Sequence, residues 1–230
     1  MKNNISLKWL LSMLSFLPMF TVCALFMVLS LFMTEEFLKT ETDAQLKNAQ
    51  SKINHEMSDL LQQLTGKAQW VASDPLFSEA VAQRDSAQVR QKALAITEAK
   101  MADVVTVIDN DGVVLARGHD TKAGDVMQAR AVVKKAMEGQ AVSGIEAGNV
   151  VKFSARAAVP ITQNGKRVGV IIVGSELTKN HVYVDIIKKS FGVECTLFLG
   201  DERVSTTATT PEGGRGTGTK LARQDILDAS

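Results

Sequence analysis

The sequence has very few of the residues that build metal centres and disulfide frameworks. It contains two cysteines, Cys23 in an apolar N-terminal stretch and Cys195 far along the chain. We expect no disulfide between them, and the lack of Cys/His clusters excludes a zinc site. Cys195 alternates with Val193, Leu197 and Leu199, which is typical of the inward face of a strand, so we interpret it as a core residue.

An excess of one charge and the motifs of catalysis are missing as well. The 26 Lys and Arg residues nearly balance the 25 Asp and Glu residues, which removes the general electrostatic reason to bind nucleic acid. His55, His119 and His181 lie in separate segments, and there is neither a glycine-rich phosphate loop nor a nucleophile elbow. The sequence therefore predicts no enzyme, no cofactor, no bound metal and no nucleic-acid partner.

One long apolar run is present, from Trp9 to Met33. It carries no charged side chain and is long enough to cross a bilayer, which takes about 20 residues. It continues into the acidic pair Glu35-Glu36 without a small-x-small cleavage site, so we predict an uncleaved transmembrane helix over residues 9–33. Lys2 and Lys8 precede the span, which places residues 1–8 in the cytoplasm and the chain from residue 34 outside it.

A long helical region, residues 34–101, is expected after the span. Its first part carries apolar residues at steps of three and four, which place them on one helix face: Leu46, Ala49, Ile53, Met57, Leu60, Leu64, Ala68 and Val71. This stripe fits a helix packed on its own domain, a seam between two helices of a dimer, or both. Asp74-Pro75 predicts a second helix to about Gln83, and Ser86 is expected to cap a third that runs to about Met101.

Residues 102–230 are predicted to form a sheet domain, because β-branched residues become frequent at Ala102. Strands are expected over residues 104–108, 113–116, 142–146, 150–161, 167–177, 193–199 and 203–207, with Asn164-Gly165 as a tight hairpin turn. Helices are expected over residues 131–137 and from a cap at Thr178 to Phe191. This order lacks the strand–helix alternation of parallel sheets, so the predicted fold class is α+β with an antiparallel sheet.

The strand over residues 150–161 has two unlike faces. Alternation places Phe153 and Ala155 on an apolar face, and Lys152, Ser154 and Arg156 on a cationic one. Such a polar face is commonly the solvated outer side of an antiparallel sheet. The alternative is a pocket for a small anion, because the planar fork of Arg matches a carboxylate while Lys and Ser add further donors.

In this order the residues resemble the Cache family of extracytoplasmic sensors, in particular the single-Cache type of bacterial methyl-accepting chemotaxis receptors. The resemblance rests on Val105–Gly112, Leu115–His119, Lys152–Ile161, and Gly165 with Val168–Gly174, preceded by the long helix and the membrane span. It implies a PAS-like sheet that holds a small ligand, often an organic acid. The ligand-binding residues that the resemblance implies are Arg117, His119, Lys152, Ser154 and Arg156, with Arg156 as the main anchor.

The resemblance also bears on the class of ligand. Relatives that bind di- and tricarboxylates often carry an arginine three residues before the loop histidine. Here Ala116 occupies that position, and Arg117 lies two residues before His119. Smaller monocarboxylates are therefore an equally good expectation.

The resemblance further implies a receptor in the bacterial inner membrane, with a periplasmic or extracellular sensor and a homodimer formed through the long helix. It also implies a second span, a HAMP linker and a cytoplasmic signalling region, so we expect these 230 residues to be truncated within the sensor domain or to be a fragment of a longer receptor. Alternatives are the sensor of a histidine kinase or cyclase receptor, and a membrane-tethered adaptor with a solvated cationic strand. Convergence of the Arg117, His119 and Arg156 side chains on one cavity favours sensing, whereas their divergence into solvent favours the adaptor.

Overall fold

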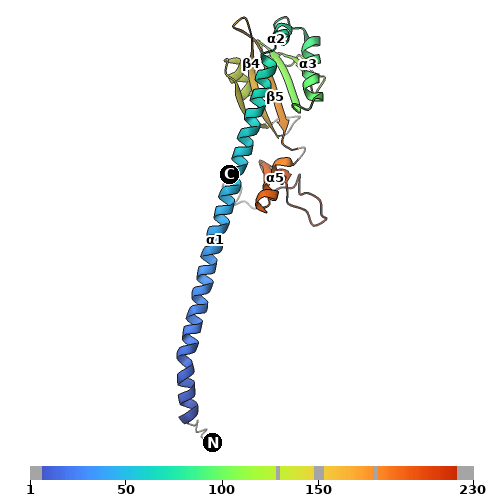
Figure 1. Ribbon diagram of the computed structural model, residues 1–230. Helices are drawn as coiled ribbons and strands as arrows, with labels where there is room; N and C mark the ends of the chain where they lie inside the picture. Colours follow the sequence, from blue (N-terminus) through green and yellow to red (C-terminus); the bar gives the residue numbers. More distant parts are fainter. Residues whose placement is uncertain (1–6, 128–129, 148–152, 179–180, 222–230) are drawn as a thin grey trace. The chain divides into compact units, whose positions relative to one another are not determined.

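The computed structural model describes residues 7–127, 130–147, 153–178 and 181–221 (Figure 1). The chain divides into two compact units, residues 1–51 and residues 52–230. Helix α1 (Leu7–Ala72) supplies the first unit and begins the second.

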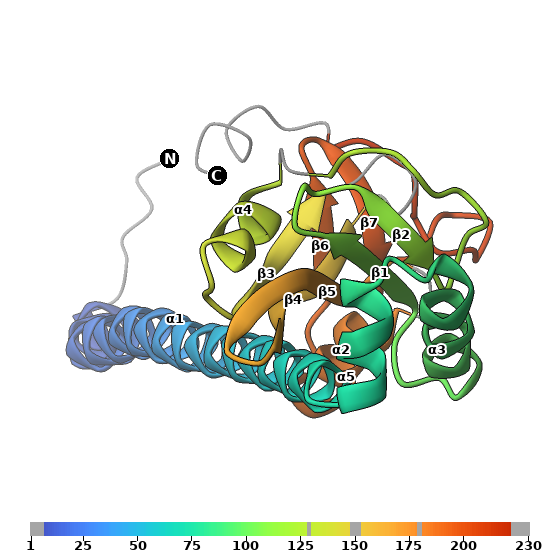
Figure 2. The same ribbon diagram turned by 90° about the horizontal axis from the view of Figure 1, so that it is seen from above.

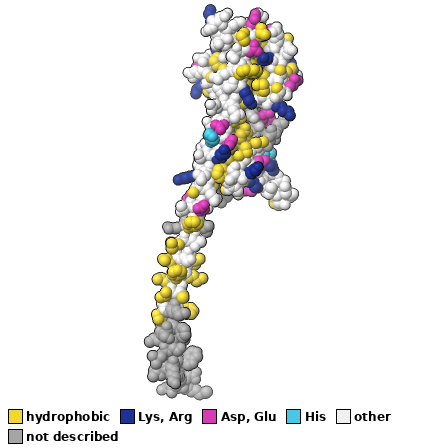
Figure 3. Space-filling view, in the orientation of Figure 1, with side chains coloured by type: hydrophobic (Ala, Val, Ile, Leu, Met, Phe, Trp, Pro, Cys, Tyr) yellow, Lys and Arg dark blue, Asp and Glu magenta, His cyan; other side chains and the backbone are white. Residues whose placement is uncertain are grey.

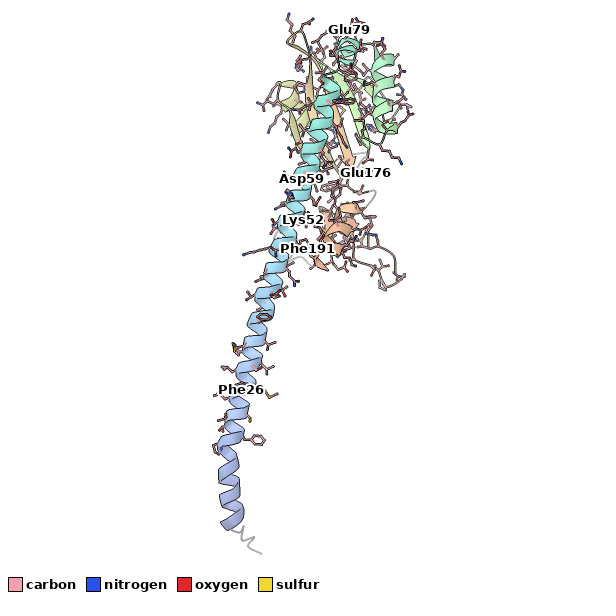
Figure 4. All side chains as sticks on the ribbon, in the orientation of Figure 1. Phe26, Lys52, Asp59, Glu79, Glu176 and Phe191 are labelled. Carbon is pink, nitrogen blue, oxygen red and sulfur yellow. The ribbon has the colours of Figure 1, made fainter. Side chains whose placement is uncertain are left out.

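The first unit contains the apolar part of α1. By length and composition this stretch is a candidate membrane span, with a mean hydropathy of 1.7 over its most apolar window and no buried residue in it. Figure 3 shows that hydrophobic side chains cover this part of the helix, and Figure 4 shows Phe26 projecting from it. Its large exposed apolar side chains include Phe20, Leu25, Phe26, Leu29, Phe32 and Met33. The helix therefore has the properties that the sequence predicted for a span.

In the second unit, α1 packs on its own domain. Leu64, Ala68 and Val71 are buried in one apolar cluster, which also takes in buried side chains of α2 (Pro75–Ala82) and α3 (Ser86–Glu98). Packing on the same chain is therefore confirmed for this end of the apolar stripe, while the homodimer through the long helix stays a prediction. Asp74 caps α2 as expected, because its side chain accepts hydrogen bonds from the first backbone N–H groups of that helix.

The cap of α3 differs from the prediction by one residue. The side chain of Asp85 accepts hydrogen bonds from the backbone N–H groups of Ala87 and Gln88, while Ser86 is already the first helical residue. Both residue types are good N-caps, so the sequence did not separate them.

Five antiparallel strands form the main sheet. They are β1 (Val104–Asp109), β2 (Val114–Arg117), β3 (Val142–Ala147), β4 (Phe153–Gln163) and β5 (Lys166–Glu176), in the order β2-β1-β5-β4-β3. The hairpin between β4 and β5 turns at Asn164 and Gly165, whose φ angles of 50° and 74° suit the left-handed turn that an Asn-Gly pair favours. The antiparallel α+β fold is confirmed.

Helices cover both faces of this sheet. Figure 2 shows α2 and α3 on one side and α4 (Ala131–Met137) on the other. Val105, Val107 and Ala157 point to the side of α1, α2 and α3, whereas Ile108, Ala158 and other side chains join a second cluster with α4. We call the second side the α4 face. Successive residues of each strand therefore pack alternately into the two apolar clusters on either face of the sheet.

The remaining elements form a small two-stranded sheet with one helix. These are α5 (Val182–Phe191), β6 (Thr196–Leu199) and β7 (Glu202–Thr206). The expected cap at Thr178 is wrong: α5 begins at Val182 behind His181, which has a φ of +47°, and the Thr178 hydroxyl donates to Glu176. Glu176 lies at the end of β5 (Figure 4).

Candidate ligand-binding site

The α4 face changes from apolar to polar along β4. Ala158 belongs to the apolar cluster with α4, whereas Arg156 and Ser154 follow it on the same face. In the register of the sheet, Arg156 lies between two glycines, Gly144 on β3 and Gly174 on β5. A Cβ atom at Gly174 would come within 3.2 Å of Arg156 Cγ. The stem of Arg156 therefore occupies the surface above Gly174, and Val132 of α4 stands 3.7 Å from the position of a Cβ atom at Gly144.

Arg156 and Ser154 are buried. Arg156 is 5% exposed and Ser154 is fully buried, and Arg156 Nε donates a hydrogen bond of 2.7 Å to Ser154 Oγ. Burial lowers the pKa of Arg156, the charge of Arg130 lowers it further, and the carboxylate of Glu146 opposes both effects. The interpretation of this strand face as a solvated surface is wrong for these two residues. Lys152, predicted on the same face, lies outside the described residues.

Arg117 is the last residue of β2, where it pairs with Thr106, and it is also buried. Its guanidinium makes a bidentate ion pair with Asp125, with distances of 2.7 and 2.8 Å, and donates a further hydrogen bond of 2.6 Å to the carbonyl oxygen of Lys122. The hydrogen bonds from Arg117 lower the pKa of Asp125 to about 2. Arg117 therefore fastens the loop that follows β2 and already holds a counter-charge.

His119 lies two residues after Arg117, on the other side of a glycine that touches α3. A Cβ atom at Gly118 would stand 2.2 Å from the carbonyl oxygen of Ala93, so this position turns towards α3. His119 Nδ1 lies 3.0 Å from the carbonyl oxygen of Val105 and 3.2 Å from its backbone nitrogen. Nδ1 donates to the oxygen in one tautomer and accepts from the N–H in the other, and in both Nε2 has no hydrogen-bond partner among the described residues.

The electrostatics of His119 connect the predicted residues. Partial burial of its ring is the main cause that lowers its pKa, and the charges of Arg117 and Arg156 lower it further, against the hydrogen bond to Val105 and the charge of Asp120. Arg117 and Arg156 also lie on the same side of the sheet: Arg117 pairs with Thr106, two residues before Ile108 of the α4 face, and Arg156 lies two residues before Ala158 of that face. The convergence of Arg117, His119 and Arg156 on one cavity stays a prediction.

Two further charged residues belong to the site and were missed from the sequence. Arg130, at the N-cap of α4, lies 3.4 Å from the carboxylate of Glu146 on β3. Glu146 pairs with Ser154 across the sheet. Neither residue stood out, because their approach depends on the register of β3 with β4, which no local pattern fixes.

A family assignment follows from comparison of the whole sequence with known families. The model of a double sensory domain of two-component sensor kinases matches residues 39–229. The chain belongs to this double Cache family. The prediction of an extracytoplasmic Cache sensor from a signalling receptor is therefore confirmed, while the single-Cache type gives way to the double type. The chemotaxis class stays a prediction.

Two solved structures of low sequence identity have a fold similar to that of this chain. The sensor domain of the Vibrio cholerae histidine kinase DctB is 16% identical, with a TM-score of 0.57 over 84% of this chain and 75% of that chain. The periplasmic domain of Vibrio cholerae LuxQ is 15% identical, with a TM-score of 0.50 over 80% of this chain and 84% of that chain. At these identities the likeness concerns the fold alone. Comparison with curated proteins gave no match.

Outside the site, two other kinds of centre to consider are a metal-binding cluster and a reactive thiol. In the described part of the double Cache domain, no group of three or more His, Cys, Asp or Glu side chains could hold a metal ion. Cys195 is partly buried and lines a small apolar pocket with Ile53, Met57, Ile187 and Leu197. Burial raises the pKa of its thiol, which fits a packing residue better than a nucleophile.

Proposed function

We propose that this chain is the extracytoplasmic ligand-binding part of a signalling receptor of the bacterial inner membrane, and that its ligand is a small organic acid anchored by Arg156. The observation that carries the proposal is a buried guanidinium beside two glycines. No carboxylate of the described residues lies within ion-pair distance of Arg156. An ion held out of water is costly without a counter-charge, and a ligand carboxylate supplies that charge.

The adaptor alternative is the weaker of the two functions. It needs Arg156 and Ser154 to be solvated, and both are buried. For the output of the receptor, the description of the family supports a two-component sensor kinase, whereas the sequence resemblance supported a chemotaxis receptor. The coding sequence beyond the codon for Ser230 separates them, because a phosphotransfer histidine on a helical hairpin and a methylated signalling hairpin are different modules.

Isothermal titration calorimetry of the full chain in detergent micelles tests the ligand class. Acids of two to six carbons are titrated into the wild type and into Arg156→Gln. At least one acid is expected to bind the wild type. The variant should lose about 10- to 100-fold in affinity, because a charge-assisted hydrogen bond to the carboxylate is removed.

Arg203→Gln provides the matched control. Arg203 lies on β7 in the small sheet, where it contacts Thr219 and the carbonyl oxygen of Lys220. Its replacement should leave acid binding unchanged. Binding that survives Arg156→Gln, or a wild type that binds no acid of the panel, contradicts the proposed function.

A further inference from the structure

Three arginines contribute charge to the site, and two of them are already paired. Arg117 holds both carboxylate oxygens of Asp125 at 2.7 and 2.8 Å. Arg130 lies 3.4 Å from Glu146. Among the described residues, no carboxylate lies within ion-pair distance of Arg156, and its guanidinium donates to the neutral hydroxyl of Ser154. Of the three guanidinium groups in the described part of the site, that of Arg156 is therefore the one without an ion-pair partner.

We infer that the site selects acids with a single carboxylate, and that Asp125 determines this selectivity by occupying the fork of Arg117. The inference rests on the proposed function and adds the ligand class to it. A second ligand carboxylate would find the donors of Arg117 already directed at Asp125 and at the carbonyl oxygen of Lys122. It would have to displace a bidentate partner, and Asp125 would then lose its own counter-charge.

Glu146 also disfavours the binding of a second ligand carboxylate. Its side chain is 14% exposed, and it stands across the strand pair from Ser154, close enough to influence the charge of Arg156. A second carboxylate near Ser154 would meet this negative charge, which Arg130 only partly offsets at 3.4 Å. Asp125 in turn is ionised throughout the physiological range, since its pKa is about 2. Asp125 therefore keeps the negative charge that pairs with Arg117 at physiological pH.

Pairs of acids that differ by one carboxylate test the inference. Butyrate against succinate, and propionate against malonate, keep the carbon number and change one methyl group into a carboxylate. Calorimetry of the full chain in detergent micelles should show the monocarboxylate of each pair binding about tenfold more tightly or better. In Asp125→Asn, which keeps the size of the side chain and removes its charge, Arg117 becomes available. The preference for butyrate over succinate should then fall about tenfold or reverse.

Asp185→Asn is the matched control, because Asp185 makes an equivalent bidentate pair with Arg215, at 2.8 and 2.9 Å, on α5. This variant should keep the wild-type preference. If Asp125→Asn does not fold, as judged by circular dichroism, Glu146→Gln takes its place and should likewise lower the preference for butyrate.

The outcomes separate the inference from the proposed function. A wild type that binds succinate as tightly as butyrate overturns the inference and leaves the proposed function standing. A preference that Asp125→Asn does not change in folded protein overturns the role of Asp125. Failure of every acid to bind the wild type overturns the proposed function itself.

Discussion

Replacing Arg156 and its partner together is expected to abolish acid binding without destabilising the domain. Arg156 is 5% exposed, and Nε donates to the buried hydroxyl of Ser154 at 2.7 Å. A single Arg156→Met change would leave that hydroxyl buried without its partner. The double variant Arg156→Met/Ser154→Ala removes both groups, and Met keeps most of the length and apolar volume of the arginine side chain.

The magnitude follows from two opposing effects. Burying an ion costs several kcal/mol, and no carboxylate of the described residues repays this cost at Arg156. The lost hydrogen bond between a charged donor and Ser154 contributed about 1.5–3 kcal/mol. The double variant should therefore have a free energy of unfolding between that of the wild type and about 2 kcal/mol above it.

Urea denaturation followed by circular dichroism, on the full chain in detergent micelles, measures this difference. The same preparations are titrated with butyrate to measure binding. A double variant that loses more than about 2 kcal/mol of unfolding free energy would show that Arg156 stabilises the sheet, which contradicts a buried charge kept for ligand binding. Retained butyrate binding would refute it as well.

Three further predictions use the same denaturation assay. Leu64→Ala should lower the free energy of unfolding by about 2–5 kcal/mol, because Leu64 is 1% exposed, whereas Leu76→Ala, at a position 75% exposed, should change it by less than about 0.5 kcal/mol. Gly118→Ala should cost about 1–3 kcal/mol because of its close contact with α3, whereas Gly66→Ala, in open space on α1, should stabilise by about 0.5–1 kcal/mol. The pKa of His119 is lowered from its ordinary value of 6.5, so the unfolded chain takes up a proton more readily. Its contribution to stability is therefore full above about pH 6.5 and decreases as the pH falls towards the folded-state pKa, and His119→Gln should remove that decrease. If unfolding free energy depends on pH in the same way for His119→Gln and the wild type, the role given to His119 is wrong. If Leu64→Ala and Leu76→Ala, or Gly118→Ala and Gly66→Ala, change the unfolding free energy equally, the packing described for that pair is wrong.

Local patterns predicted most of the elements. The spacing of Leu64, Ala68 and Val71 predicted the buried face of α1, and Asn164-Gly165 predicted the hairpin between β4 and β5. Such signals lie within a few consecutive residues, where side-chain period and turn chemistry act directly. The start of α5 was missed because His181 adopts a left-handed φ instead of the expected cap at Thr178.

The sequence by itself determined that one face of β4 is cationic, that a candidate span precedes the domain, and that Arg117, His119 and Arg156 are the residues to consider. The tertiary structure alone decided that the polar face is buried and that Asp125 engages Arg117. The physical reason is that burial and ion pairing depend on which strands and loops meet. Strand register and loop path are set by contacts between distant segments, whereas alternation along a strand is set by the strand alone.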